Sequence, residues 1–242
     1  MGVLNVTPDS FSDGGRWLDA GAAVAHGLRM VEEGADIVDV GGESTRPGAD
    51  PVDTQEELRR VLPVIEALAP HVRVSIDTRK AEVAEAALAA GASLLNDVSA
   101  SLAPVARAAG AGWVAMHMQG EPATMQQDPS YDDVVAEVRA FLVERAETAG
   151  VEEVWIDPGI GFGKTMEHNL ALLAHLDELV ATGYPVVVGT SRKSFLGRLT
   201  GGAPADDRVE ASIATAAWAL AHGASMVRVH DVAPTVAAAR LL

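Results

Sequence analysis

The feature that most limits the fold is a recurring unit. In it, a short apolar run leads through a polar or glycine-rich loop into an alanine-rich stretch with helical spacing. The short runs are apolar along their whole length, as expected for parallel strands that are covered on both faces. The pattern predicts eight strands, at residues 3–6, 36–40, 72–76, 93–96, 113–117, 154–156, 185–189 and 226–229. It predicts helices between them, at residues 20–33, 54–68, 81–90, 132–149, 167–181 and 207–222, and a short last helix at 234–242.

Eight strands that alternate with helices favour an α/β fold of the TIM (β/α)8 barrel type. The 242 residues suit one such barrel as a single domain, residues 1–242. A doubly wound open sheet is the alternative. The barrel is preferred because polar residues follow nearly every strand, and a barrel brings all strand ends to one face. These residues are Asn5, Glu43, Asp77, Asn96, Asp97, His117, Asp157, residues 191–193, Arg228 and His230.

The acidic balance of the chain limits its partners. The sequence has 18 Lys and Arg against 34 Asp and Glu, a formal net charge of −16, which disfavours nucleic acid and anionic membranes. It has no cysteine, so disulfides, thiolate metal sites and cysteine nucleophiles are excluded. The first residues lack a signal-peptide pattern, and the longest stretch without a formal charge, residues 211–227, is too short and polar for a membrane span. We therefore expect a cytoplasmic protein.

The glycine-rich segment DPGIGFGKT, residues 157–165, does not match a nucleotide-binding loop. Pro158 stands where the P-loop pattern needs its first glycine, and Lys164 stands where a GxGxxG motif from Gly159 needs its last. The alternative is a flexible glycine-rich loop after a strand, with Asp157 at its root and Phe162 at its tip.

Other strand-end residues allow both a structural and a functional interpretation. Asp77, Asn96 and Asp157 could cap helices, but acid and amide groups on three strands favour a site for a polar heterocycle. The basic residues in 191–193 and 228–230 could form surface ion pairs, but their place after the last two strands favours a phosphate site. The polar segments 5–15 and 41–48 could be surface loops or lids over a substrate.

Seven ordered motifs, which together span essentially the whole chain, resemble the dihydropteroate synthase family of pterin-binding enzymes. They are NVTPDSFSDGG, GGESTRPGA, SIDT, NDVS, DPGIGFGK, TSRKSF and RVHD. The resemblance implies a TIM barrel, usually a homodimer, that condenses 6-hydroxymethyl-7,8-dihydropterin diphosphate with p-aminobenzoate to give 7,8-dihydropteroate and pyrophosphate. It also implies folate biosynthesis, Mg2+ as the cofactor and inhibition by sulfonamides. The short termini are the visible departure from the family pattern.

Carried over motif by motif, the resemblance assigns roles to individual residues. The pterin-binding residues are Asp77, Asn96, Asp157 and Lys193, and the diphosphate-binding residues are Asn5, Thr45, Arg228 and His230. The p-aminobenzoate-binding residues are Phe11, Thr45, Pro47, Phe162, Lys193 and Ser194, and the Mg2+ ligands are Asn5 and Asp13. The catalytic set is Asn5, Asp13, Arg46, Lys193, Arg228 and His230.

These roles favour a dissociative substitution, because charge is stabilised at both ends of the breaking C–O bond. Two rivals share the barrel. A pterin-dependent methyltransferase binds a substrate without a diphosphate, so it leaves the basic residues after the last two strands unexplained. A non-catalytic pterin-binding paralogue should lack loop or anion-site residues, and none is missing from the sequence.

Overall fold

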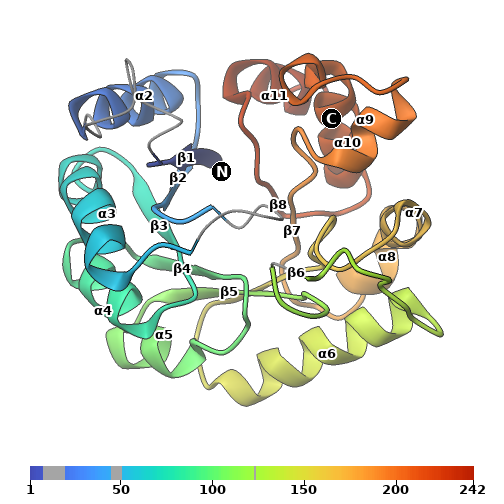
Figure 1. Ribbon diagram of the computed structural model, residues 1–242, viewed down its shortest axis with the longest axis horizontal. Coiled ribbons are helices and arrows are strands. Elements are labelled where there is room, and N and C mark those ends of the chain that lie inside the picture. The colour runs from blue at the N-terminus through green and yellow to red at the C-terminus, as the bar shows by residue number, and fades with distance from the viewer. Residues whose placement is uncertain (8–19, 45–50, 123) are drawn as a thin grey trace.

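The computed structural model describes residues 1–7, 20–44, 51–122 and 124–242. Within these ranges, parallel strands lie at the centre and helices surround them (Figure 1). The strands are β1 (Gly2–Asn5), β2 (Ile37–Gly41), β3 (Arg73–Asp77), β4 (Leu94–Asp97), β5 (Gly112–Met116), β6 (Val154–Asp157), β7 (Val187–Val188) and β8 (Met226–Val227). The helices are α2 (Ala20–Glu32), α3 (Thr54–Leu68), α4 (Ala81–Ala89), α5 (Ala103–Ala109), α6 (Val134–Ala149), α7 (Met166–Ala174), α8 (Leu176–Val180), α9 (Ser194–Leu199), the 3-10 helix η1 (Ala205–Asp207), α10 (Val209–Ala221) and α11 (Val232–Ala239).

The strands close into a barrel, which confirms the predicted fold over the open sheet. Strands β1 to β6 form one sheet in sequence order, and β7 pairs with β8. Parallel bridges between Ile156 and Val186 and between Gly2 and Val229 join the two pieces. The amide of Val3 donates to the carbonyl of Val229 at 2.9 Å. Closure therefore brings the last strand beside the first.

Most predicted elements are confirmed to within a few residues. Helix α3 has the predicted bounds, and the side chain of Asp53 caps it by accepting from the amide of Glu56 at 2.9 Å. The helix predicted at 167–181 is divided into α7 and α8 at His175, whose φ of −110° and ψ of 35° are not helical. The sequence pattern does not predict α5 and α9, because seven and six residues are too few to show helical periodicity.

Alternate residues of each strand face either the helices or the interior of the barrel. Val38 and Val40 belong to the large core between strands and helices. Ile37, Leu94 and Met226 belong to a second, smaller apolar cluster, whose members come from several strands and no helix. This cluster therefore fills the interior of the barrel at the amino-terminal half of the strands.

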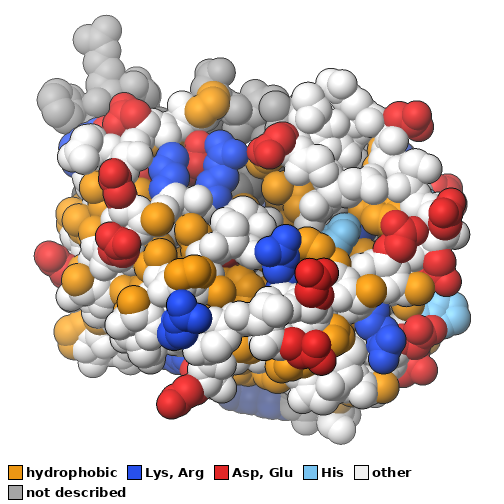
Figure 2. All heavy atoms as spheres, turned by 90° about the horizontal axis from the view of Figure 1, so that it is seen from below, with side chains coloured by type: hydrophobic (Ala, Val, Ile, Leu, Met, Phe, Trp, Pro, Cys, Tyr) orange, Lys and Arg blue, Asp and Glu red, His pale blue; other side chains and the backbone are white. Residues whose placement is uncertain are grey.

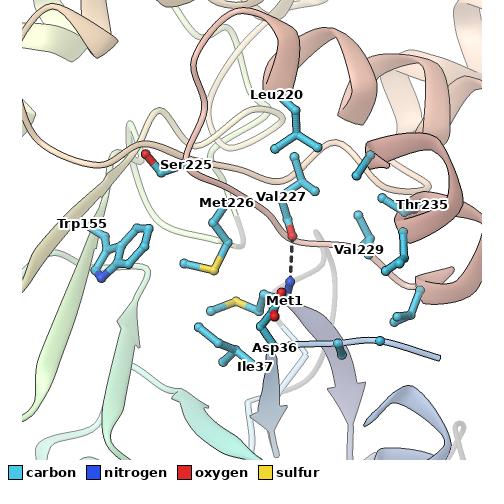
Figure 3. Close-up of a pocket in the computed structure, with 15 residues that line it drawn as sticks. Met1, Asp36, Ile37, Trp155, Leu220, Ser225, Met226, Val227, Val229 and Thr235 are labelled. Atoms are coloured by element: carbon cyan, nitrogen blue, oxygen red, sulfur yellow. Dashed lines mark hydrogen bonds between the residues drawn. The ribbon is translucent and has the colours of Figure 1, made fainter. Parts of the chain in front are cut away.

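A cavity of about 340 Å³ opens beside this apolar cluster (Figure 3). Met1, Ile37, Trp155 and Met226 line it, and the terminal ammonium of Met1 donates to the carbonyl of Val227 at 3.0 Å. These four residues lie at or next to the amino-terminal ends of β1, β2, β6 and β8, and residues of α10 and α11 line the cavity as well. The cavity is therefore at the opposite end of the barrel from the polar strand ends, where TIM barrels carry their active sites.

The surface in Figure 2 carries Asp and Glu side chains interspersed with Lys and Arg side chains, with apolar side chains between them. None of the helices in the described ranges combines the length and the apolar character that crossing a bilayer needs.

Candidate active site

A polar layer lies above the apolar cluster, at the carboxyl ends of the strands. Two residues beyond Ile37, Leu94 and Met226 along their strands come Asp39, Asn96 and Arg228, which face the same interior. Asp77 pairs in register with Asn96, and Asp157 ends β6. Asn96 and Asp157 are each 5% exposed. The structure therefore gathers the predicted strand-end groups at one mouth of the barrel.

Arg228 connects the groups of this layer. Its Nη2 donates to Oδ2 of Asp77 at 2.6 Å, and its Nε donates to Oδ2 of Asp39 at 2.6 Å. Nδ2 of Asn96 donates to the same oxygen of Asp39 at 3.0 Å. Four residues from β2, β3, β4 and the end of β8 thus form one hydrogen-bonded network.

Asp39 is the member of this network that the sequence analysis missed. It is fully buried in a strand that is otherwise apolar. A single carboxylate inside such a run is the signal that could have identified it, because an unpaired charge is rarely buried in a barrel interior.

Burial and neighbouring charges shift the pKa values of these groups. Burial raises the pKa of Asp77 to about 7, although Arg228 opposes the shift. Burial also raises the pKa of Asp157, against the effect of Lys193. Burial alone would lower the pKa of Arg228, but Asp39 and Asp77 raise it above its ordinary value. The mouth therefore holds a permanent cation beside carboxyl groups that gain protons easily.

Lys193 follows β7, the strand that pairs with β8. Its Nζ donates to the carbonyl oxygen of Ile160 and lies 4.8 Å from the centroid of the Phe162 ring. Burial lowers the pKa of Lys193 to about 8, against the attraction of Asp157. Lys193 thus places one amine between the acidic end of β6 and an aromatic side chain.

The glycine-rich loop that carries Phe162 makes several hydrogen bonds to neighbouring segments. Gly161 donates from its amide to Asn169 at 2.7 Å and accepts at its carbonyl from Gln126 at 2.6 Å. The hydroxyl of Tyr131 donates to the carbonyl of Gly163 at 2.8 Å. These bonds hold the loop in one place, and its glycines permit this close packing.

Comparison with known proteins identifies the family. The model of the pterin binding enzyme family matches residues 1–230. The dihydropteroate synthase of Mycobacterium leprae is 53% identical to this chain over 259 residues, which cover 100% of this chain and 91% of that protein. This chain belongs to the dihydropteroate synthases. As a member of that family it is a transferase.

Solved structures of other dihydropteroate synthases have the same fold. The Xanthomonas albilineans enzyme with 4-aminobenzoic acid has a TM-score of 0.92 and 51% identity, over 99% of this chain and 90% of that chain. The Yersinia pestis enzyme with a sulfonamide drug has a TM-score of 0.92 and 46% identity, over 99% of this chain and 91% of that chain. These likenesses confirm the fold of this dihydropteroate synthase over nearly its whole length.

Three further family residues lie at the rim of the mouth. Asn5 ends β1, is partly buried and pairs in register with Gly41. The amide of His230 donates to Oγ of Ser191 at 3.1 Å, and Nδ1 of His230 lies 3.0 Å from the same oxygen. Ser194 is exposed at the first turn of α9. The rim thus offers amide, imidazole and hydroxyl groups around the charged centre.

Two other polar strand-end residues have structural roles. Glu43 accepts from Nζ of Lys80 at 3.0 Å and from the amide of Val52 at 3.1 Å, so it ties the end of β2 to the start of α3. Asp97 accepts from the amide of Leu102 at 2.6 Å and from the indole N–H of Trp113 at 3.1 Å. Within the described ranges, neither side chain is hydrogen-bonded to the network around Arg228.

The ion-pair interpretation holds for one predicted basic residue. Arg192 donates to Asp231 through Nη2 at 2.5 Å and through Nε at 3.0 Å. The phosphate interpretation of residues 191–193 therefore depends on Lys193. The remaining predicted site residues lie outside the described part of the chain; they are Phe11, Asp13, Thr45, Arg46 and Pro47.

Proposed function

We propose that this dihydropteroate synthase condenses 6-hydroxymethyl-7,8-dihydropterin diphosphate with p-aminobenzoate and releases pyrophosphate, as a step of folate biosynthesis. The observation that carries the proposal is one mouth holding two carboxyl groups, Asp77 and Asp157, and two basic side chains, Lys193 and Arg228. Carboxyl groups suit the N–H donors of a pterin, and cations suit its carbonyl oxygen and an anionic leaving group.

The pterin ring is proposed to lie against Asp77, Asn96, Asp157 and Lys193. Oδ1 of Asp77 is buried and has no hydrogen-bond partner among the described residues. A buried acceptor without a partner costs free energy, which an N–H donor of the ring would recover. Asp157 already accepts from the amide of Gly159 at 2.7 Å, which fixes its carboxyl group.

The diphosphate is proposed to lie over Asn5, Arg228 and His230, with Thr45. Two nitrogens of Arg228 bond carboxylates of the pterin end, so this residue connects the two ends of the substrate. The described residues form no cluster of three or more His, Asp or Glu that could hold a metal. The side-chain oxygen of Asn5, with Asp13, nevertheless suits Mg2+, which accepts few protein ligands when phosphate oxygens supply the others. When bound, Mg2+ would neutralise charge on the leaving diphosphate.

The p-aminobenzoate pocket is proposed to consist of Phe162, Lys193 and Ser194, together with Phe11, Thr45 and Pro47. Phe162 and Lys193 already contact each other through the ring and the amine. An aromatic face beside an ammonium suits a ligand that has both an aromatic ring and a carboxylate.

We propose that the bond to diphosphate breaks before the new bond forms. The C–O bond at the pterin methylene breaks, and its electron pair leaves with the diphosphate. The amine nitrogen then attacks the methylene carbon, forms the C–N bond and loses a proton. Asp77 and Asp157 place negative charge near the cation. The attacking aniline nitrogen is neutral, so this step needs no strong base. Arg46 and Asp13 complete the proposed catalytic set of Asn5, Lys193, Arg228 and His230.

The test is pyrophosphate release from the dihydropterin diphosphate, with and without p-aminobenzoate and with and without Mg2+. We expect pyrophosphate release that depends on Mg2+. We also expect dihydropteroate to form when p-aminobenzoate is present. Diphosphate release or exchange without the amine is expected from the dissociative order, and strict dependence on the amine would contradict that order. Pterin binding without release in any condition would instead support a methyltransferase or a non-catalytic paralogue.

We also propose that the enzyme is a cytoplasmic homodimer. The measurement is the mass in solution by light scattering, and the expected value is twice the chain mass of 25.1 kDa. A mass of one chain at all concentrations would contradict the dimer.

A further inference from the structure

Asp39 is a fully buried carboxylate inside the barrel, directly beside the candidate active site. It is the third residue of β2, and Ile37, Val38 and Val40 in the same strand are apolar and buried. It pairs in register with Ser75 of β3. A carboxylate in such a position costs folding free energy unless a positive charge and hydrogen bonds compensate it.

Among the described residues, Asp39 accepts hydrogen bonds through one oxygen only, and both donors belong to residues of the proposed site. Oδ2 accepts from Nε of Arg228 at 2.6 Å and from Nδ2 of Asn96 at 3.0 Å. Because the side-chain nitrogen of Asn96 donates to Asp39, the side-chain oxygen of Asn96 points away from Asp39. Because Arg228 is held by Asp39 and by Asp77, the plane of its guanidinium group is fixed at two points.

Some polar atoms at and beside Asp39 have no hydrogen-bond partner among the described residues. Oδ1 of Asp39 and Oγ of its register neighbour Ser75 are buried and have no hydrogen-bond partner among the described residues. If Asp39 contributed to stability alone, we would expect both of its oxygens to have hydrogen-bond partners, or an apolar side chain of similar size in its place. The contacts of Asp39 instead converge on groups that face the substrate.

We infer that Asp39 is a positioning residue of the pterin site, and that its carboxylate holds Arg228 and Asn96 in the orientation that receives the ring. The inference rests on the proposed function, because it takes the ligand of this mouth to be a pterin. Asp39 touches no substrate atom in this account. It acts through Arg228 and Asn96.

The experiment compares the affinity of wild type and Asp39→Asn for 6-hydroxymethylpterin, measured by calorimetry, with thermal unfolding of each protein. Asparagine keeps the size of the side chain and one acceptor oxygen, but it removes the charge that holds Arg228. We expect the dissociation constant to rise at least about tenfold, the order expected when a charge-assisted bond is lost.

Asp97→Asn is the matched control. Asp97 is as deeply buried as Asp39, and its carboxylate also accepts several hydrogen bonds. The donors are Trp113 and the turn at Ser99–Leu102. It should lower the unfolding temperature and leave the dissociation constant within about twofold of wild type. If Asp97→Asn weakens pterin binding as much as Asp39→Asn, general loosening of the barrel explains both and the inference is wrong.

Asp39→Glu is the second variant, because Asp39→Asn could fail to fold. Glutamate keeps the charge but moves the carboxylate by one methylene. It therefore cannot accept from both Arg228 and Asn96 with the same geometry. We expect weaker binding of 6-hydroxymethylpterin by this variant also. Wild-type affinity in either folded variant would overturn the inference. Failure of wild type itself to bind the pterin would instead reject the proposed function.

Discussion

Lys164 and His117 meet in the interior of the protein, with Nζ of the lysine donating to Nδ1 of the imidazole at 2.9 Å. The same ammonium donates to the carbonyl oxygens of Phe162 at 2.9 Å and of His117 at 3.3 Å. Lys164 is only 3% exposed. Burial lowers its pKa to about 7, and burial together with Lys164 lowers the pKa of His117 to about 3. This contact joins the loop that carries Phe162 to the end of β5.

Replacing this lysine should therefore affect the amine substrate more than the pterin. Lys164→Met removes one hydrogen bond to the Phe162 carbonyl and two to His117, which together link the Phe162 backbone to the end of β5. The loss costs on the order of 1–3 kcal/mol. We expect the KM for p-aminobenzoate to rise by about tenfold and the KM for the pterin diphosphate to change by less than about twofold.

The matched control is Arg73→Met at the opposite end of the barrel, which breaks the 2.7 Å ion pair with Glu153. This variant should lower the stability of the protein without changing the KM for p-aminobenzoate more than the KM for the pterin diphosphate. Equal changes in both KM values for Lys164→Met would count against a role for Lys164 in placing Phe162.

The buried lysine should also change how stability depends on pH. The folded-state pKa of Lys164, about 7, lies below its ordinary value of 10.5. Between these values the unfolded chain binds more protons, so the free energy of unfolding rises with pH. Urea unfolding at pH 7 and pH 9 should therefore show that wild type gains stability relative to Lys164→Met. Parallel changes in the two proteins would contradict the shifted pKa.

Asp157→Asn should lose far more activity than stability. The residue ends β6 at the mouth, and the asparagine can still accept from the amide of Gly159. We expect kcat/KM to fall by about 100-fold or more, because charge near the developing cation is lost. The unfolding midpoint should shift by only a few degrees. Proportional losses of both quantities would indicate a structural role for Asp157.

Pterin binding should weaken as the pH falls below 7, because protonation removes the charge of Asp77 and part of its acceptor capacity, so that it accepts more weakly from the ring. Burial and the charges of Asp39, Glu57 and Asp97 raise the pKa of Asp77 to about 7, and Arg228 lowers it. In Asp39→Asn one of the negative neighbours is lost, so the weakening should begin at a lower pH than in wild type. Calorimetric titrations with 6-hydroxymethylpterin on both sides of pH 7 measure this shift. An unshifted profile would contradict the coupling of the two carboxyl groups.

Sulfonamides should inhibit in competition with p-aminobenzoate, because both are proposed to occupy the pocket beside Phe162 and Lys193. Phe162→Ala should raise the KM for p-aminobenzoate and the inhibition constant of a sulfonamide by similar factors, of about tenfold. Steady-state kinetics at several concentrations of both ligands measure the two constants. Noncompetitive inhibition, or resistance of the wild-type enzyme, would contradict the shared pocket.

The positions of the site residues along the strands could be predicted because a strand-end position is a local property. Asp77, Asn96 and Asp157 follow or end apolar runs, and closure of the barrel then brings them to one face. The bonding partners of individual residues could not be predicted. Arg192 and Arg228 both follow strands, yet Arg192 pairs with Asp231 at the rim and Arg228 turns inward to two carboxylates.

The sequence by itself determined the barrel and the family, because both depend on the order and spacing of local patterns. Only the tertiary structure decided that Arg228 bonds Asp39, 189 residues away, and Asp77, 151 residues away. Such contacts depend on the register at which β8 closes against β1 and on the space left inside the barrel. Hydrophobic periodicity reports which face of a strand is buried, but it carries no information on which buried groups meet across the interior.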